Sequence, residues 1–196
     1  MIAKPLLQRA VVALAALLCA TAVLAQTAPE PRRPDVIFVP TPEDVVEKML
    51  EIANVTGKDI LYDLGSGDGR IPITAAKRFG TRGVGIDIDP QRIKEANENL
   101  QKSGVGDKVR FIQGDLFQQD LSKATVITLY LLPALNLKLR PTLLKLKPGT
   151  RIVSHDFDMG DWKPDKTAKV GSRNVYFWVV PDPATAAKIG KSAAKK

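Results

Sequence analysis

Apolar and polar residues follow two alternating patterns along most of this chain. Helical spacing of the apolar residues predicts helices over about 42–53, 71–79, 90–102 and 134–146. Short apolar runs between them predict strands over about 59–64, 82–87, 108–113, 124–130 and 150–155. Strands and helices that alternate in this way predict an α/β domain whose parallel sheet is built with right-handed crossovers.

Capping residues and prolines sharpen three of these predictions. Thr41 is expected to cap the first helix, with Pro42 in its first position and Asp44 as a capping-box acid. Asp89 is expected to cap the third helix. Pro141 is expected to break or kink the fourth helix, because proline cannot donate a backbone hydrogen bond.

The pattern changes after the fifth strand. Residues 166–170 and 174–180 are rich in strand-forming side chains and are separated by Gly171-Ser172-Arg173. Two such runs around a short glycine turn predict a β-hairpin. The end of the domain is therefore expected to be antiparallel.

A glycine-rich turn joins the first strand to the second helix. From Asp63 to Arg70 the sequence reads Asp-Leu-Gly-Ser-Gly-Asp-Gly-Arg. Glycine adopts positive φ at little cost and has no Cβ, so its backbone can come close to a ligand. A strand, a glycine turn and a helix start form the arrangement in which backbone meets a nucleotide-like ligand.

An acidic residue follows this turn at a distance that suits the binding of a ribose. Asp87 ends the second predicted strand, twenty-two residues after Gly65. A carboxylate at that tip can accept hydrogen bonds from both hydroxyls of a ribose. A dinucleotide fingerprint would need a third glycine where Arg70 stands, and Asp63 beside the turn would repel a pyrophosphate. The charges favour S-adenosylmethionine, a sulfonium, over NAD.

The ends of the chain differ in composition from the middle. Residues 1–25 have a basic start, an apolar run shorter than a membrane span and small residues before position 26, which predicts a signal peptide and export to the periplasm. The alternative is an uncleaved segment that anchors the protein to the inner membrane. Residues 26–36 are expected to be a flexible spacer, 37–183 the folded domain and 184–196 a basic Ala/Lys tail.

Charge and cysteine content exclude some kinds of chemistry. The formal net charge is +8, but several lysines lie in the tail and no basic-aromatic pattern marks a nucleic-acid surface. We therefore expect no nucleic-acid partner. Cys19 is the only cysteine, and cleavage of the signal peptide would remove it, which excludes thiol catalysis and cysteine–metal sites. No metal site is expected.

Several motifs resemble those of the seven-β-strand methyltransferases. The stretches 63–70, 85–89 and 114–116 are similar to motif I, the acidic motif after it and the adenine-binding motif. The stretches 39–42 and 128–133 resemble a narrower group, the lysine methyltransferases related to the mitochondrial enzymes that modify the adenine nucleotide translocator and the c subunit of ATP synthase. The resemblance implies a Rossmann-like, doubly wound, mostly parallel seven-stranded sheet, closed by the C-terminal antiparallel hairpin. Many members of the narrower group have Tyr where this chain has Phe38, which puts any role of that hydroxyl in doubt.

The resemblance also implies a binding role for particular residues. The methionine part of S-adenosylmethionine would lie along the glycine turn, with Asp63 near its amino group. Asp87 would hold the ribose, and Asp115 and Leu116 would meet the adenine. The implied cofactor-binding set is Asp63, Gly65, Ser66, Gly67, Gly69, Asp87, Asp115 and Leu116.

Aspartates gather at one edge of the predicted sheet. They stand at or just beyond the carboxyl ends of four strands, at Asp63, Asp87, Asp115 and Asp156. Such an acidic crevice would attract both a sulfonium and a lysine ammonium, so the expected partner is a protein with an accessible lysine, including a membrane protein. The residues expected to contact this acceptor are Thr41, Tyr130, Asp156 and Trp162.

Some roles and alternatives stay open. No residue is assigned as catalytic, and the single histidine, His155, is expected to be structural. A small-molecule methyltransferase is the alternative within enzymes. An exported cofactor-binding module without catalysis is the alternative outside them, because S-adenosylmethionine is made in the cytosol.

Overall fold

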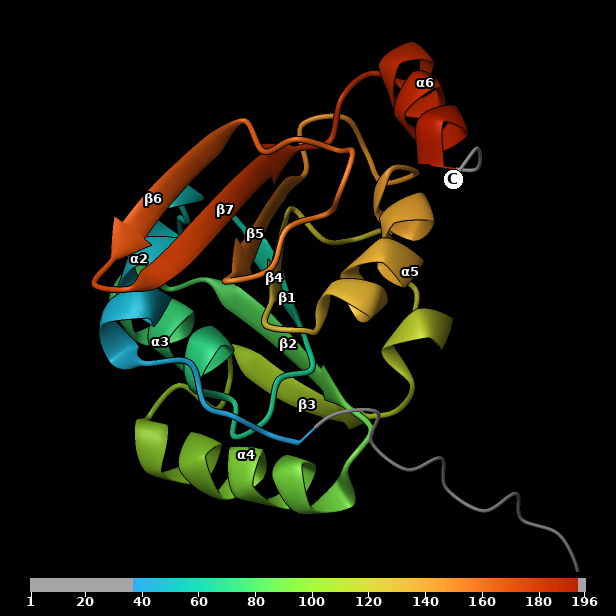
Figure 1. Ribbon diagram of the computed structural model, residues 1–196. Coiled ribbons are helices and arrows are strands. Elements are labelled where there is room, and N and C mark those ends of the chain that lie inside the picture. Colours follow the sequence, from blue (N-terminus) through green and yellow to red (C-terminus); the bar gives the residue numbers. More distant parts are fainter. Residues whose placement is uncertain (1–36, 194–196) are drawn as a thin grey trace, which may run out of the picture. The chain divides into compact units, whose positions relative to one another are not determined.

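The computed structural model describes residues 37–193, and within them seven strands form one sheet in the order β3-β2-β1-β4-β5-β7-β6 (Figure 1). Strands β1 to β5 are parallel, and β7 runs antiparallel to both β5 and β6. This confirms the predicted fold, a Rossmann-like and mostly parallel sheet closed by an antiparallel hairpin. The strands are β1 Ile60–Leu64, β2 Arg82–Asp87, β3 Val109–Gln113, β4 Val126–Leu129, β5 Arg151–His155, β6 Lys166–Val170 and β7 Arg173–Val179.

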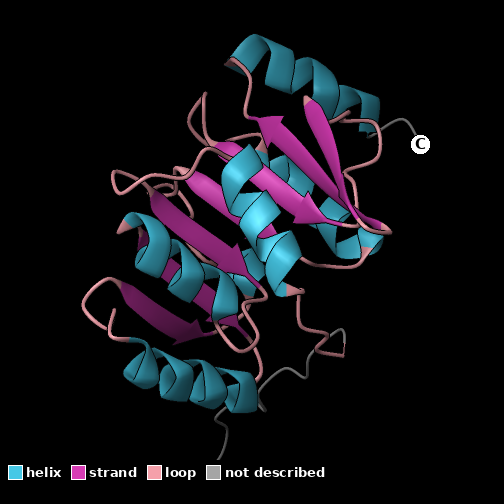
Figure 2. Ribbon diagram, turned by 90° about the vertical axis from the view of Figure 1, so that its left-hand side faces the viewer, coloured by secondary structure: helices cyan, strands magenta, loops and turns pink. Residues whose placement is uncertain are grey.

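Helices cover both faces of this sheet (Figures 1 and 2). Two apolar clusters separate the faces: one joins α2 and α3 to the sheet, and the other joins α5 and α6 to the opposite face. Successive strand residues alternate between the clusters, as in Val126 and Ile127, because side chains along a strand point to opposite faces. The helices are α2 Glu43–Ile52, α3 Arg70–Phe79, α4 Pro90–Ser103, α5 Pro133–Leu143 and α6 Pro183–Ala193, with a 3₁₀ turn at Leu116–Gln118.

The helix boundaries test three of the sequence predictions. Asp89 caps α4 as expected, because its side chain accepts a hydrogen bond from the backbone N–H of Gln91 at 2.8 Å. The predicted cap at Thr41 is wrong: Pro42 is the N-cap of α2, and no side chain caps that helix. Pro141 does not break α5, which continues through it to the end of the helix. Proline removes only one backbone hydrogen bond, and the turns before it hold the helix together.

The predictions for the two ends of the chain fare differently. The expected signal peptide, 1–25, and the spacer, 26–36, lie outside the described residues. Residues 184–193 of the expected basic tail belong to α6, where Ala186 is buried in the core. Between residues 37 and 193, the helices are all too short or too polar to cross a membrane.

The strand order creates a crevice at one edge of the sheet. From β1 the chain builds outward to β2 and β3, then returns to add β4 and β5 on the other side of β1. The loops after β1 and β4 therefore leave in opposite directions, which opens a crevice beyond the carboxyl ends of these strands. The candidate site lies there.

Candidate functional site

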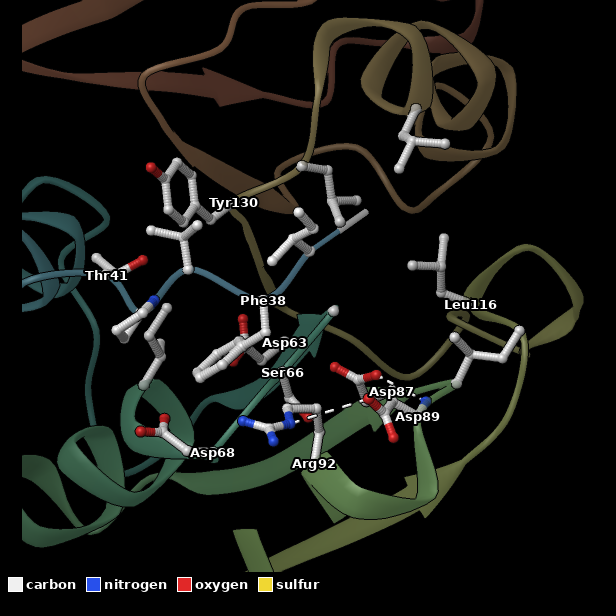
Figure 3. Close-up of a pocket in the computed structure, with 18 of the residues that line it drawn as sticks. Phe38, Thr41, Asp63, Ser66, Asp68, Asp87, Asp89, Arg92, Leu116 and Tyr130 are labelled. Atoms are coloured by element: carbon white, nitrogen blue, oxygen red, sulfur yellow. Dashed lines mark hydrogen bonds and ion pairs between the residues drawn. The ribbon is translucent and has the colours of Figure 1, made fainter. Parts of the chain in front are cut away.

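A pocket opens at the carboxyl ends of β1 to β4, and the segment before α2 forms one of its sides (Figure 3). Thr41 and Tyr130 lie toward one end, and Asp87, Asp89 and Leu116 toward the other. The expected acidic edge is present. The aspartates that line the pocket are Asp63, Asp68, Asp87, Asp89 and Asp115.

The glycine loop after β1 takes the shape that its sequence predicts. Gly65, Gly67 and Gly69 have φ of 80°, 51° and 80°, a region that residues with a Cβ rarely adopt. The backbone N–H groups of Gly65 and Ser66 both donate to the carbonyl of Ile86, at 2.8 and 3.0 Å. The loop is therefore folded back against the end of β2.

Phe38 covers this loop from the segment before α2. A Cβ on Gly67 would lie 2.0 Å from the phenyl ring of Phe38, so the ring packs directly on the bare backbone. The guanidinium of Arg92 also lies over this ring, 4.9 Å from its centre. The segment is further held by Arg70, which donates to the carbonyl of Thr41 at 2.9 Å.

Asp87 connects the tip of β2 to the glycine loop. Its Oδ2 accepts from the backbone N–H of Gly67 and its Oδ1 from that of Asp89, each at 2.9 Å. Burial raises the pKa of this carboxyl above its usual range, although the two backbone hydrogen bonds oppose the rise. Asp87 thus faces the pocket as a rigidly held acceptor.

Asp63 is the most deeply buried carboxyl of the site. It is 3% exposed, and its Oδ1 accepts a hydrogen bond of 2.6 Å from the hydroxyl of Thr128 on β4. Burial raises its pKa to about 7, against the lowering effect of Thr128, and the charges of Asp87 and Asp68 raise it further. Such a carboxyl gains its charge most easily when a cation arrives beside it.

The cationic side chains of the pocket are engaged by acidic side chains. Arg70 makes an ion pair of 2.6 Å with Asp68, and Arg92 makes one of 2.8 Å with Glu95 and a longer one of 3.9 Å with Asp89. Asp63 and Asp87, by contrast, make hydrogen bonds but no ion pair within residues 37–193. The negative charge near the glycine loop is therefore left for a ligand.

The opposite end of the pocket is aromatic. The ring of Tyr130, half-buried after β4, stacks on that of His155 at the end of β5, with centroids 3.8 Å apart and planes at 28°. Thr41 is buried and shares a hydrogen bond of 3.3 Å with Nδ1 of His155. Thr41 therefore lines the pocket, but its hydroxyl is occupied by the hydrogen bond to His155.

Asp156 lies just behind this end, outside the residues that line the pocket. Its backbone has φ of 58°, and the N–H of Phe157 donates to the carbonyl of His155 at 2.7 Å, which closes a tight turn. Its carboxylate accepts from Arg173 and from the backbone N–H of Asn174, both at 2.8 Å. Asp156, which was expected to contact the acceptor, is therefore connected to the pocket only through its neighbours.

The remaining expected residues divide between the pocket and the core. Asp115 and Leu116 line the pocket after β3, where Asp115 also accepts from the N–H of Phe117 at 2.9 Å. Trp162 is 5% exposed, packs beside Trp178 and lies outside the pocket lining, a placement that favours a role in the core. No three His, Cys, Asp or Glu side chains in residues 37–193 are grouped so that they could hold a metal ion.

The residues present suit a ligand with a sugar, a base and a positive charge. Ser66 has a buried hydroxyl without a hydrogen-bond partner in the described part of the chain, and it belongs to the glycine loop that lines the pocket. Asp87 keeps lone pairs for hydroxyl groups, since a carboxylate can accept about four hydrogen bonds. The buried Asp63 supplies the negative charge that an ammonium or sulfonium would neutralise.

Sequence reasoning missed several residues of this site. Arg92, Thr128 and the contact role of His155 carry no local motif, and each acts on a residue from a distant part of the chain. Alternation along β4 could have placed Thr128 on the same side as Asp63, because the two strands are parallel and in register at those residues.

The chain is similar in sequence to known proteins. A family model described as the ANTKMT methyltransferase domain matches residues 63–166. A protein-lysine N-methyltransferase from Saccharolobus islandicus (strain REY15A) is 50% identical over 153 residues, which are 75% of this chain and 95% of that protein. The Mus musculus lysine N-methyltransferase named for the c subunit of ATP synthase is 29% identical over 140 residues, which are 71% of this chain and 56% of that protein.

A solved structure is also similar. It is described as an RNA methyltransferase from Salinibacter ruber in complex with S-adenosyl-L-homocysteine. It has 59% sequence identity and a TM-score of 0.73, and the match covers 74% of this chain and 95% of that one. The two similar proteins that are covered almost completely therefore carry different acceptors in their names.

Proposed function

This chain belongs to the ANTKMT methyltransferase domain family and is an S-adenosylmethionine-dependent methyltransferase, and we propose that its acceptor is the side chain of a protein lysine. The observation that carries the proposal is the 50% identity to a protein-lysine N-methyltransferase over 95% of that protein's length. The acidic pocket supports it, because an ammonium side chain would be drawn toward the same carboxylates as the cofactor.

The residues of the pocket fit S-adenosylmethionine in a definite order. Asp115 and Leu116 would meet the adenine, Asp87 the ribose, and the loop from Gly65 to Gly67 the methionine. Asp63 would balance the positive charge of the amino group. When bound, the cofactor supplies a methyl group on a good leaving group, so no residue needs to activate the methyl.

The protein must still align the lysine nitrogen with the methyl group and allow the lysine to lose a proton. A lysine must present a neutral nitrogen about 3 Å from the methyl carbon. Burial of the amine and the neighbouring sulfonium lower the amine's pKa, whereas carboxylates close to it would raise the pKa. Tyr130 would form the wall beside the acceptor nitrogen, and Asp63 would remain with the cofactor.

The entrance supports a protein acceptor with apolar surroundings, such as a membrane protein. Ile37 and Val39 line the pocket yet are 90% and 54% exposed, and Leu132 just after Tyr130 is 48% exposed. Apolar side chains at the mouth of an acidic pocket suit a lysine that lies among apolar residues. A protein exported to the periplasm, or held at the inner membrane by residues 1–25, would meet such targets.

RNA is the second candidate acceptor, because the Salinibacter ruber structure at 59% identity is described as an RNA methyltransferase. The pocket itself favours lysine. Phosphates would approach an edge that carries the five aspartates of the pocket, and the two arginines of its lining are engaged by acidic side chains, Arg70 by Asp68 and Arg92 by Glu95 and Asp89. A small-molecule acceptor is the third possibility that the experiment must separate.

The test is to incubate the full chain with cell extract and S-adenosylmethionine labelled in its methyl group. We expect label in protein, in a fraction that resists ribonuclease, and methyllysine after hydrolysis. Label that ribonuclease releases would replace lysine with RNA, and label found only in small molecules would replace it with a metabolite. Asp87→Ala serves as the inactive control. Mass spectrometry of the N-terminus, with fractionation of cells, tests export: an intact N-terminus in the cytosol would refute it.

A further inference from the structure

The order of the strand ends fixes which end of the pocket receives the acceptor. Along the sheet edge the order is β3 with Asp115, β2 with Asp87, β1 with the glycine loop, β4 with Tyr130 and β5 with His155. If the adenine and ribose lie at the β3–β2 end, as proposed above, the methyl group and its acceptor meet at the β4–β5 end. Figure 3 shows Tyr130 and Thr41 at that end, away from Leu116.

His155 forms the floor behind Tyr130. Its side chain is 0% exposed and lies on the same face of the sheet as α2. The preceding residue, Ser154, points to the opposite face, toward α5. The centroid distance of 3.8 Å to Tyr130 is that of full ring contact, and Phe157 adds a second stacked ring 6.1 Å from Tyr130. The position of the Tyr130 ring thus depends on His155.

The imidazole is held by a hydrogen bond at one nitrogen and faces a carboxylate at the other. Thr41 fixes Nδ1 through a hydrogen bond of 3.3 Å. Nε2 lies 3.4 Å from a carboxylate oxygen of Asp156 and forms no hydrogen bond within residues 37–193. Asp156 in turn is anchored by Arg173, whose charge also reaches the hydroxyl of Tyr130. Burial lowers the pKa of His155 below its usual range, against the raising effect of Asp156.

We infer that His155 is a positioning residue: it holds the ring of Tyr130 as the wall of the acceptor end and ties that wall, through Thr41, to the segment that covers the glycine loop. The inference rests on the proposed function only in calling this end the acceptor end. A residue that fills space could be replaced by any side chain of similar volume, whereas this role requires a flat ring.

Nuclear magnetic resonance tests the contact without any turnover, because the chain has a single histidine and its ring resonances need no assignment. In an untagged full chain we expect the ring protons of His155 to be shifted by the Tyr130 ring current, and to return toward ordinary values in Tyr130→Leu. Tyr62→Phe, a change in the core on the opposite face, is the control and should leave them in place. Unshifted resonances in the wild type would overturn the inference.

Kinetics test the positioning role. His155→Gln keeps a partner for Thr41 but loses the ring, and we expect kcat to fall about tenfold, because misplacing one wall disturbs the alignment of the reacting atoms. His155→Phe keeps the ring but loses the partner of Thr41, and it should retain more of kcat than His155→Gln. The dissociation constant of S-adenosylmethionine, measured by calorimetry, should stay within about twofold of wild type in His155→Gln, which keeps the partner of Thr41.

A double-mutant cycle separates this role from general stability. If His155 acts through Tyr130, His155→Gln should cost little further activity in a Tyr130→Leu background. Losses that multiply would overturn the inference. Should the His155 variants not fold, Thr41→Val keeps the histidine and is expected to move its nitrogen resonances. If the acceptor proves not to be lysine, the resonance shifts and cofactor affinities still stand, so the two failures can be told apart.

Discussion

The carboxylate of Asp87 accepts a hydrogen bond from the backbone N–H of Gly67 at 2.9 Å, and this contact fastens the end of β2 to the loop after β1. Backbone N–H groups of the same loop also donate hydrogen bonds to the carbonyl of Ile86 on β2. One side chain therefore serves two purposes: it shapes the glycine loop and keeps lone pairs for the ribose of the cofactor. Cofactor affinity should respond sharply to its removal.

We expect Asp87→Ala to weaken binding of S-adenosylmethionine about a hundredfold, because two hydrogen bonds to a charged group are worth about 3 kcal/mol. Calorimetry on the full chain measures this directly. The matched control is Asp107→Ala, an exposed aspartate before β3 at the opposite edge of the sheet, which should bind like wild type. Equal affinity in Asp87→Ala and wild type would place the cofactor somewhere else.

The contact between Gly67 and Phe38 predicts a difference between two glycines. Gly67 and Gly104 both have positive φ, 51° and 79°, but a Cβ on Gly67 would lie 2.0 Å from Phe38, whereas a Cβ on Gly104 would meet nothing within 4 Å. Both Gly→Ala changes should cost about 1 kcal/mol in stability for the backbone alone, because a Cβ is strained at left-handed φ. Only Gly67→Ala should also displace Phe38 and weaken cofactor binding.

Calorimetry and thermal unfolding of these two alanine variants make the comparison. Phe38→Ala added to Gly67→Ala should recover part of the lost stability, because the clashing ring is gone. Two variants that lose cofactor affinity equally would contradict the role given to Phe38.

The parts of the site that could be predicted from the sequence are those set by neighbouring residues. The glycine loop needs positive φ at fixed positions, and Asp87 follows a strand whose length fixes where it ends. The same holds for Asp89, whose capping bond reaches only two residues along the chain. Residues close in the sequence determine these features, so they could be predicted from the sequence.

The parts that could not be predicted depend on contacts between distant segments. Thr41 was expected to cap α2, but its hydroxyl meets His155, 114 residues away, and Pro42 takes the cap position instead. No spacing rule reports such a pairing, because it depends on the face to which β5 turns each side chain. Trp162 packs against Trp178 outside the pocket lining, and its contact with the acceptor stays a prediction.

The raised pKa of Asp63, about 7, predicts that cofactor binding releases a proton. The positive charge of the ligand favours the ionised carboxylate, so near pH 7 the bound state should hold fewer protons than the free protein, and affinity should rise with pH. Calorimetry in buffers of different ionisation enthalpy measures the protons released. Asp63→Asn, which has no proton to lose, should show less release, and an unchanged value would refute the role of Asp63.

The same carboxyl predicts how stability depends on pH in the free protein. Its folded pKa of about 7 lies above the unfolded value of 3.8, so between these values the folded state holds more protons. Its contribution to stability is therefore lost as pH rises from about 4 to about 7. Denaturant unfolding of wild type minus that of Asp63→Asn isolates this slope, because the other titrating groups are common to both. A difference that does not vary with pH would contradict the prediction.

The opposite edge of the sheet offers a site where stability should change without function. Arg151 at the start of β5 pairs with the buried carboxylate of Asp59 and donates to the carbonyls of Ala53 and Asn54, at 2.7 and 2.8 Å. Arg151→Ala leaves these acceptors without their donor, and we expect it to lower the free energy of unfolding by about 3 kcal/mol, as when one partner of a buried ion pair is removed.

Affinity for S-adenosylmethionine should not change below the melting temperature, because the pocket lies beyond the other ends of the strands. Arg110→Ala, on an exposed face of β3, is the matched loss of one arginine and should leave stability within about 0.5 kcal/mol. An Arg151→Ala protein as stable as wild type would refute the stabilising role of this ion pair, and one that stays folded but cannot bind the cofactor would show that the two edges are not independent.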